Sequence, residues 1–111
     1  MKILITDGIE KIGADILLRA GFELTQKTLS PEELLATIGD FDAIIVRSAT
    51  KVTKVVIEAG TNLKVIARGG VGLDNIDIEW AKMKGIKVLN TPKASSISVA
   101  ELTIAHDRIN P

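Results

Sequence analysis

The 111-residue sequence contains no cysteine and a single histidine, and these shortages exclude several kinds of site. Without cysteine there are no disulfides, thiolate metal ligands or thiol nucleophiles, and one histidine cannot supply a histidine-rich metal centre. Basic and acidic residues balance at fourteen each, so no excess charge favours nucleic acid or an anionic membrane as a partner. No apolar run approaches the roughly 18 residues of a membrane span, and the N-terminus does not resemble a signal peptide. We therefore expect a soluble cytoplasmic domain with no metal site.

Apolar residues make up 46% of the sequence and charged residues 25%, which is typical of one globular domain with a substantial core. Short apolar runs alternate with amphipathic stretches along the chain. Most of these runs are rich in β-branched residues, as in strands buried on both faces of a parallel sheet. The expected strands lie at 3–5, 22–26, 43–46, 63–67 and 86–89.

Recognisable end signals mark the first two helices between these strands. Ser30 and Glu33 form a capping box with Pro31 at the first helical position. The preceding helix is expected to end at Gly21 and to bury one apolar stripe. That stripe consists of Ile9, Ile12, Ile16, Leu17 and Ala20.

The remaining three helices also begin at capping residues. Thr53 and Asp77 are the expected N-caps of the third and fourth helices. Ser98 and Glu101 match a second capping box, which would open the fifth helix.

The alternation gives five βα units within residues 1–105, with a polar, irregular tail at 106–111. Right-handed crossovers between such units produce an open parallel sheet with helices on both faces. For five strands the flavodoxin-like order 2-1-3-4-5 is the natural choice.

Ligands of such sheets bind beyond the carboxyl ends of the strands. Guanidinium groups bind carboxylate and phosphate, and glycine lets backbone N–H groups approach an oxyanion. The strand ends therefore predict a site for a small acid, with or without a phosphate group. Equally, the glycines can serve only to turn the chain and the arginines only to form salt bridges. The segments concerned are Thr6-Asp7-Gly8, Arg47-Ser48-Ala49-Thr50, Arg68-Gly69-Gly70-Val71-Gly72 and Asn90-Thr91-Pro92.

The glycine-rich segment is not a dinucleotide fingerprint. After Gly70 and Gly72 the third glycine is replaced by Asn75, and the acidic residue expected about 20 residues further on is missing at 89–90. We therefore do not expect nucleotide binding by these residues alone. Asp74 and Asn75 are expected to hydrogen-bond the backbone of the turn.

Three other features have structural explanations. His106 is expected to be solvated or to lie at a helix end, since a catalytic base must be held rigidly beside its substrate. Trp80 is expected to pack rather than to stack on a ligand. Lys51 and Lys54 are expected to form a solvated face.

Three motifs in order resemble the D-2-hydroxyacid dehydrogenases, and within them the D-3-phosphoglycerate dehydrogenases. They are Val-Arg-Ser-Ala-Thr-Lys-Val-Thr at 46–53, the stretch at 63–77, and Asn-Thr-Pro at 90–92 followed by 96–103. The resemblance extends from Met1 to about Ala105.

This resemblance implies a flavodoxin-like substrate-binding domain whose active site lies in the cleft beside a Rossmann NAD-binding domain. It implies that the arginine and serine of the first motif help to bind the substrate and its phosphate. It also implies that the glycine loop binds the substrate carboxylate and borders the nicotinamide pocket. The implied substrate-binding residues are Arg47, Ser48, Arg68, Gly69 and Gly70, and the implied cofactor contact is Val71.

The family's catalytic arginine, glutamate and histidine lie in the nucleotide-binding domain, so the resemblance implies no catalytic residue among these 111. His106 does not match the catalytic histidine motif, and Gly69 stands where the family usually has alanine. Beyond Ala105 the family continues an apolar helix, whereas residues 106–111 are polar and end in proline.

Three functional hypotheses remain open. The chain is the substrate-recognition part of an NAD-dependent dehydrogenase of serine biosynthesis, a stand-alone module that binds small anions, or a purely structural domain. The first requires a small anionic substrate and a nucleotide-binding domain as partners, with no NAD bound to these residues alone. The fifth helix would cover either its own sheet or that of a neighbour, and the second arrangement predicts a homodimer.

Overall fold

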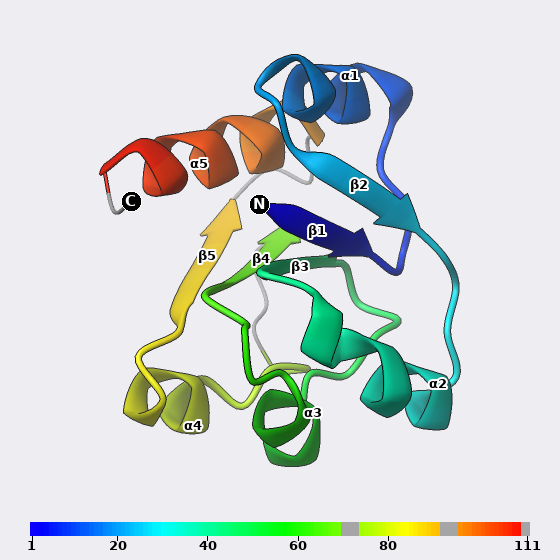
Figure 1. The fold of residues 1–111 in the computed structure, drawn as a ribbon, viewed down its shortest axis with the longest axis vertical. Helices are drawn as coiled ribbons and strands as arrows, with labels where there is room; N and C mark the ends of the chain where they lie inside the picture. The colour runs from blue at the N-terminus through cyan, green and yellow to red at the C-terminus, as the bar shows by residue number, and fades with distance from the viewer. Residues whose placement is uncertain (70–73, 92–95, 110–111) are drawn as a thin grey trace.

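A central five-stranded sheet separates two groups of helices in the computed structural model, which describes residues 1–69, 74–91 and 96–109 (Figure 1). All strand pairs are parallel and their order is β2-β1-β3-β4-β5, which confirms the flavodoxin-like order. The elements are β1 (Lys2–Ile5), α1 (Lys11–Arg19), β2 (Glu23–Gln26), α2 (Pro31–Thr37), the 3₁₀ turn η1 (Ile38–Asp40), β3 (Ala43–Val46), α3 (Lys54–Ala59), β4 (Val65–Gly69), α4 (Ile78–Met83), β5 (Lys87–Thr91) and α5 (Ser96–Ile109).

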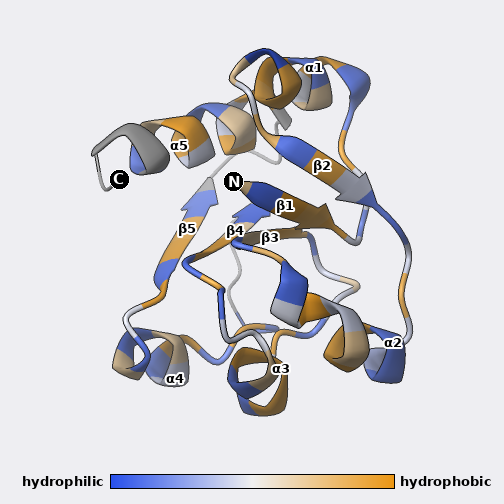
Figure 2. Ribbon diagram, in the orientation of Figure 1, coloured by the Kyte–Doolittle hydropathy of each residue, from blue (hydrophilic) through white to orange (hydrophobic). Residues whose placement is uncertain are grey.

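The sheet buries apolar side chains on both faces, because alternate residues of a strand point in opposite directions. Leu4, Ile44 and Ile66 pack with α2, α3 and α4 on one face. Ile3 and Ile45 pack with α1 and α5 on the other. Hydrophobic residues accordingly run along β1 and β3 (Figure 2), and all four residues of β3 are buried.

The expected caps of α2, α3 and α4 are present. The Ser30 hydroxyl accepts a hydrogen bond from the backbone N–H of Glu33 at 3.2 Å, and the Ser30 N–H donates to the Glu33 carboxylate at 3.0 Å. Thr53 and Asp77 each accept a hydrogen bond from the N–H three residues further on, at 3.5 and 3.1 Å. These ends follow from local sequence, because each cap joins groups three residues apart.

The stripe expected on α1 is confirmed except at Ile12, since Ile9, Ile16 and Ala20 pack against the core cluster that contains Leu17. Leu17 is fully buried, but Ile12 is 52% exposed, and the other buried residues of the helix are Gly13 and Ala14. Helix α5 packs against α1, and small residues allow two helices to approach closely. Gly13 and Ala14 are thus buried in addition to the predicted residues, while Ile12 lies at the surface. Gly21 follows the helix with a φ of 93°, as a glycine stop requires.

Helix α5 differs from the expected one at both ends. It begins at Ser96, so Ser98 and Glu101 lie inside the helix, and the predicted capping box at these residues is wrong. It continues to Ile109, so His106 is helical and the prediction of an irregular segment from residue 106 is wrong as far as 109. None of the helices in the described ranges has the length and apolar character needed to cross a membrane.

The inner face of α5 consists of Val99, Ala100 and Thr103, all buried. The Thr103 hydroxyl donates to the Val99 carbonyl at 2.8 Å, so its polar group is satisfied within the helix. Helix α5 covers β4 and β5 of its own chain, which is one of the two arrangements expected for it. The homodimer stays a prediction.

Candidate functional site

The carboxyl ends of β1, β3 and β4 meet at one edge of the sheet and bring the two arginine segments together. Val46 pairs with Arg68 in the register of β3 and β4. Arg47 follows β3 directly and is half-buried, and Ser48 is exposed. Gly69 is the last residue of β4 and is half-buried. Gly70 and Val71 lie outside the described residues. The predicted site residues that are described thus share one edge, and their role in binding stays a prediction.

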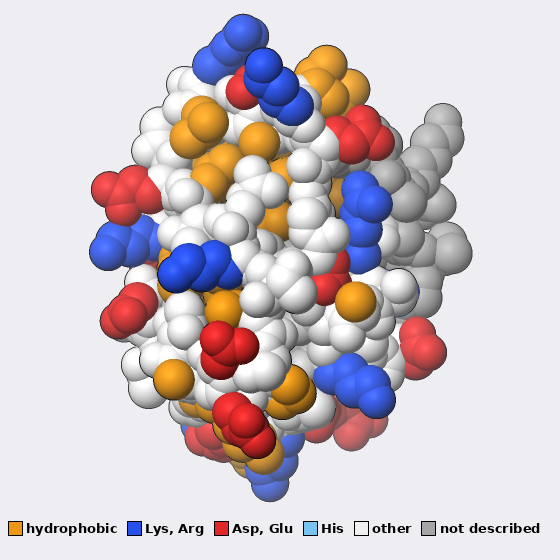
Figure 3. Space-filling model, turned by 90° about the vertical axis from the view of Figure 1, so that its right-hand side faces the viewer, with side chains coloured by type: hydrophobic (Ala, Val, Ile, Leu, Met, Phe, Trp, Pro, Cys, Tyr) orange, Lys and Arg blue, Asp and Glu red, His pale blue; other side chains and the backbone are white. Residues whose placement is uncertain are grey.

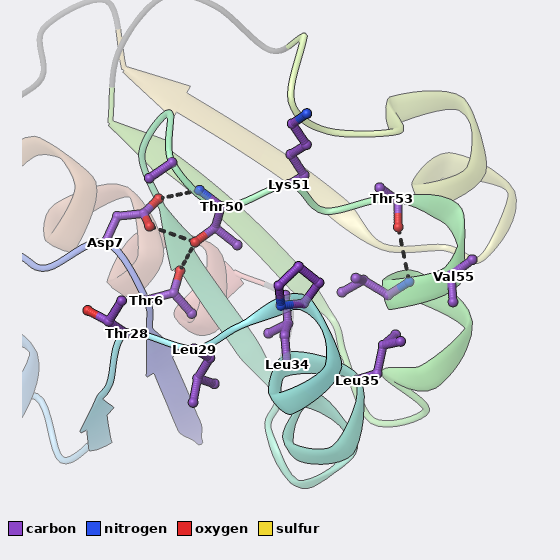
Figure 4. A pocket seen from close by; sticks show the side chains of 13 residues that line it. Thr6, Asp7, Thr28, Leu29, Leu34, Leu35, Thr50, Lys51, Thr53 and Val55 are labelled. Carbon is purple, nitrogen blue, oxygen red and sulfur yellow. Dashed lines mark hydrogen bonds between the residues drawn. The ribbon is translucent and has the colours of Figure 1, made fainter.

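The loop after β3, residues 47–50, is held from one side by Asp7 at the end of β1. Asp7 Oδ2 accepts hydrogen bonds from the backbone N–H groups of Arg47 at 2.7 Å and Thr50 at 3.0 Å. Asp7 Oδ1 accepts one from the Thr50 hydroxyl at 2.6 Å, and that hydroxyl is also hydrogen-bonded to Thr6 Oγ1 at 2.8 Å (Figure 4). One carboxylate therefore satisfies both N–H groups.

Asn75 holds the same loop from the other side. Its Nδ2 donates to the carbonyls of Arg47 and Thr50, each at 2.7 Å. Its own carbonyl accepts from the N–H of Val52 at 2.8 Å, next to a parallel bridge between Val52 and Ile76. Asn75 thus hydrogen-bonds backbone as expected, but its side chain binds the loop after β3 rather than its own turn.

Arg68 presents a buried guanidinium with unused donors. The residue is 8% exposed, and its Nη1 lies 3.8 Å from Asp74 Oδ1, too far for a hydrogen bond. The Asp74 side chain is 96% exposed, so solvent weakens this ion pair. Arg68 Nε and Nη1 have no hydrogen-bond partner among the described residues. A buried, unsatisfied cation of this kind fits a small anion as ligand.

Sequence reasoning identified the arginines but not the residues that hold their loop. Asp7 appeared only as the end of a strand, and its hydrogen-bond partners lie 40 and 43 residues away. The signal available in the sequence was its position directly after the first strand, at the edge where the other strand ends meet.

A cavity of about 500 Å³ lies behind the loop, between α2 and α3 (Figure 4). Leu34, Leu35 and Val55 form its apolar part, and Asp7 and Thr50 lie at one end. Arg47, Ser48 and Arg68 do not line it. The cavity therefore adjoins the loop at residues 47–50 through Ala49 and Thr50, but the arginine side chains do not line it.

Charge is mixed elsewhere on the described surface. On the face shown in Figure 3, basic and acidic side chains are interspersed with apolar ones. Within the described ranges, no three acidic or histidine side chains are close enough to hold a metal ion.

The pKa of Glu33 is lowered, chiefly by the hydrogen bond from the Ser30 backbone and then by that with the Ser30 side chain. Glu33 caps α2 and belongs to neither arginine segment.

The described residues do not fit the pyrophosphate of a dinucleotide. Such a group binds where a glycine-rich turn leads directly into a helix N-terminus. Here α4 begins at Ile78 after its own cap, Asp77, and does not follow the glycines directly. The link between β1 and α1 contains one glycine, Gly8.

Known proteins match this chain over most of its length. The profile of the family described as D-isomer specific 2-hydroxyacid dehydrogenase, catalytic domain, matches residues 3–108. A hydroxypyruvate reductase of Thermotoga maritima is 51% identical over 104 residues, which cover 93% of this chain and 34% of that protein. A D-3-phosphoglycerate dehydrogenase of Methanocaldococcus jannaschii is 54% identical over 104 residues, covering 94% of this chain and 20% of that protein.

Solved structures agree with these relatives. The crystal structure of NAD+-bound 3-phosphoglycerate dehydrogenase from Entamoeba histolytica aligns with a TM-score of 0.70 and 33% identity, covering 82% of this chain and 32% of that one. The chain thus spans about a third or less of the length of these three matches.

Proposed function

The chain belongs to the D-isomer specific 2-hydroxyacid dehydrogenases, and from this premise we propose that it forms the substrate-binding part of an NAD-dependent oxidoreductase. The proposed substrate is a small phosphorylated 2-hydroxy acid such as 3-phosphoglycerate, and the proposed pathway is serine biosynthesis. In this proposal Arg47 and Ser48 bind the phosphate. Arg68, Gly69 and Gly70 bind the carboxylate end.

The observation that carries the proposal is the buried guanidinium of Arg68, of which Nε and Nη1 have no hydrogen-bond partner among the described residues. Burying a cation without a full set of hydrogen-bond acceptors costs free energy, and an anion bound at this edge would supply the missing acceptors. The neighbouring loop already has its backbone groups occupied by Asp7 and Asn75. The backbone of the loop that carries the Arg47 and Ser48 side chains is therefore already fixed before a ligand binds.

We assign substrate recognition, and not hydride transfer, to residues 1–111. Hydride transfer requires the reactive carbon of the nicotinamide to be held against the substrate, and the described residues do not fit the dinucleotide. A nucleotide-binding domain would supply NAD, and Val71 would border its nicotinamide. We expect no NADH formation by the 111-residue chain alone, and activity when that domain is added in trans. A cytoplasmic location belongs to the same proposal.

A second candidate is recognition of an unphosphorylated acid. The Thermotoga maritima relative, at 51% identity, is a hydroxypyruvate reductase, and reduction of hydroxypyruvate yields glycerate. Glycerate and 3-phosphoglycerate differ only by the phosphate, so together they form a matched pair of ligands. The notion of a stand-alone anion-binding or structural module is the remaining alternative.

The test is an NMR titration of the 111-residue chain with each of the two acids. We expect 3-phosphoglycerate to bind with a dissociation constant in the millimolar range, about 4 kcal/mol, since charge pairs at an open edge are screened. Shifts should appear at Arg47, Ser48 and Gly69. Arg47→Ala should weaken binding, whereas Lys87→Ala should not, because Lys87 begins β5 at the opposite edge.

The pattern of binding decides between the candidates. Equal affinity for glycerate and 3-phosphoglycerate would favour the unphosphorylated substrate. Shifts confined to the amino edge of the sheet would contradict the site. If neither acid binds, the structural module remains as the candidate function.

A further inference from the structure

We propose that Asp7 and Asn75 are positioning residues, which hold the loop at residues 47–50 from two sides and so set the affinity of the arginine edge for its anion. The proposal rests on the proposed function, because the loop bears Arg47 and Ser48. It concerns two side chains to which neither the family resemblance nor the comparisons give a role.

The two side chains match the backbone groups that they face. The Asp7 carboxylate faces donors only: the N–H groups of Arg47 and Thr50 and the Thr50 hydroxyl, at 2.6 to 3.0 Å. The Asn75 amide nitrogen faces acceptors only, the carbonyls of the same two residues. Arg47 and Thr50 thus have both backbone polar groups held by these side chains. An ionised acceptor makes each N–H bond stronger than a neutral pair would.

The orientation of the Asn75 amide is determined by this arrangement. Its Nδ2 has two carbonyls at 2.7 Å, and its Oδ1 is buried without a hydrogen-bond partner among the described residues. Turning the amide over would place oxygen against two carbonyl oxygens and lose both bonds. Aspartate has the same shape as asparagine but no donor when ionised, so Asn75→Asp would convert two attractions into two repulsions.

The loop has little else to hold it. Ser48 and Ala49 are exposed, while Arg47 and Thr50 are only half-buried. Fixing the residues of an otherwise free loop costs conformational entropy, and ligand binding is weakened by that cost when the loop is not already fixed. Asp7 and Asn75 meet it during folding, which is preorganisation of the binding loop.

Asn75 also connects the two halves of the site. It follows the glycine-rich segment that begins at the end of β4, and it is anchored to the chain after the loop through Val52. Its hydrogen bonds therefore fix the loop after β3 relative to the turn at Asn75. A ligand that bridges both segments depends on that spacing.

The experiment compares matched variants of the 111-residue chain. Asn75→Asp removes both carbonyl contacts. Asn62→Asp is its control, because Asn62 Nδ2 donates to the Gly39 carbonyl at 2.8 Å on the loops at the opposite edge. Thr50→Val removes the hydroxyl that donates to Asp7 at nearly constant shape, and Thr50→Ser retains it. Each variant is measured for its 3-phosphoglycerate dissociation constant, its urea midpoint, and amide exchange at Arg47 and Thr50.

We expect Thr50→Val to raise the dissociation constant about five- to tenfold, the effect of one lost hydrogen bond or slightly more, and Asn75→Asp to raise it at least as much because it loses two. Thr50→Ser and Asn62→Asp should bind as the parent does. A lower urea midpoint with an unchanged dissociation constant in both Asn75→Asp and Thr50→Val would show a merely structural role and overturn the proposal. If Asn75→Asp does not fold, Thr50→Val against Thr50→Ser decides alone.

Failure of the proposed function is distinguishable from failure of this inference. If the parent chain does not bind 3-phosphoglycerate, the proposed function fails and amide exchange decides the inference. Rapid amide exchange at Arg47 and Thr50 in the parent chain would overturn the inference. Slow exchange in the parent that becomes rapid in Thr50→Val would support the inference, with another small anion as the ligand.

Discussion

Lys54 and Trp80 join α3 to α4, because the Lys54 ammonium lies 4.2 Å from the centroid of the Trp80 ring. Trp80 also packs against the core cluster beneath these helices, as expected. Lys84 lies 5.8 Å from the same ring and 3.3 Å from Glu58 on α3. Lys51 and Lys54 are both exposed, which confirms the predicted solvated face, and Lys54 in addition packs on the Trp80 ring.

The contact gives a stability prediction with a control nearby in the chain. Lys54→Met should lower the free energy of unfolding by about 0.5–1 kcal/mol, the usual size of an exposed cation–π contact. Lys51→Met should leave it nearly unchanged, since Lys51 is also exposed and has no described ring contact. Urea unfolding followed by Trp80 fluorescence measures both. Equal losses in the two variants would contradict the contact.

Helix α1 offers a test of the correction at Ile12. Leu17→Ala should cost about 2–5 kcal/mol, as large-to-small changes in a full core do, because Leu17 is 0% exposed. Ile12→Ala should change stability by about 0.5 kcal/mol or less, because Ile12 is 52% exposed. Thermal and urea unfolding of the two variants give the comparison. A large loss on Ile12→Ala would restore the stripe expected from the sequence.

The capping box of α2 makes stability depend on pH. The pKa of Glu33 is lowered by the Ser30 backbone N–H and then by the Ser30 side chain. A lowered pKa in the folded state adds stability that is complete above the ordinary glutamate pKa and is lost as the pH falls through the lowered value. Ser30→Ala keeps the backbone N–H and removes only the side-chain hydrogen bond, so it should raise the Glu33 pKa part of the way, and Ser30→Thr should keep it low. An NMR titration of the Glu33 side chain in both variants checks this, and an unchanged pKa in Ser30→Ala would refute it.

The homodimer remains open to a direct measurement. The contacts of Val99 and Ala100 beneath α5 can form within one chain or between two chains that exchange the helix. We predict exchange at high concentration, since β5 ends at Thr91 and α5 begins at Ser96, and a short connection favours exchange. Sedimentation equilibrium at two concentrations well above micromolar tests it. A single monomer mass at both would refute the dimer.

Features that depend on neighbours in the chain were determined by the sequence alone. The run Ala43–Val46 is apolar throughout and forms a central strand buried on both faces. Ser30, Thr53 and Asp77 cap helices because each accepts a hydrogen bond from an N–H three residues away. The strand order followed from the alternation of elements, because right-handed crossovers leave few arrangements of five parallel strands.

Features that depend on distant parts of the chain were decided only by the tertiary structure. Periodicity predicts the apolar stripe of α1 but not that Ile12 lies at the surface while Gly13 and Ala14 are buried. The contacts of Asp7 and Asn75 with the loop at 47–50 span 25 to 43 residues of sequence. The sequence shows that Asp7 and Asn75 follow strand ends, but no local pattern gives their hydrogen-bond partners. Folding brings the ends of β1, β3 and β4 to one edge of the sheet. Only there can the Asp7 carboxylate accept from the N–H groups of the loop and the Asn75 amide donate to its carbonyls.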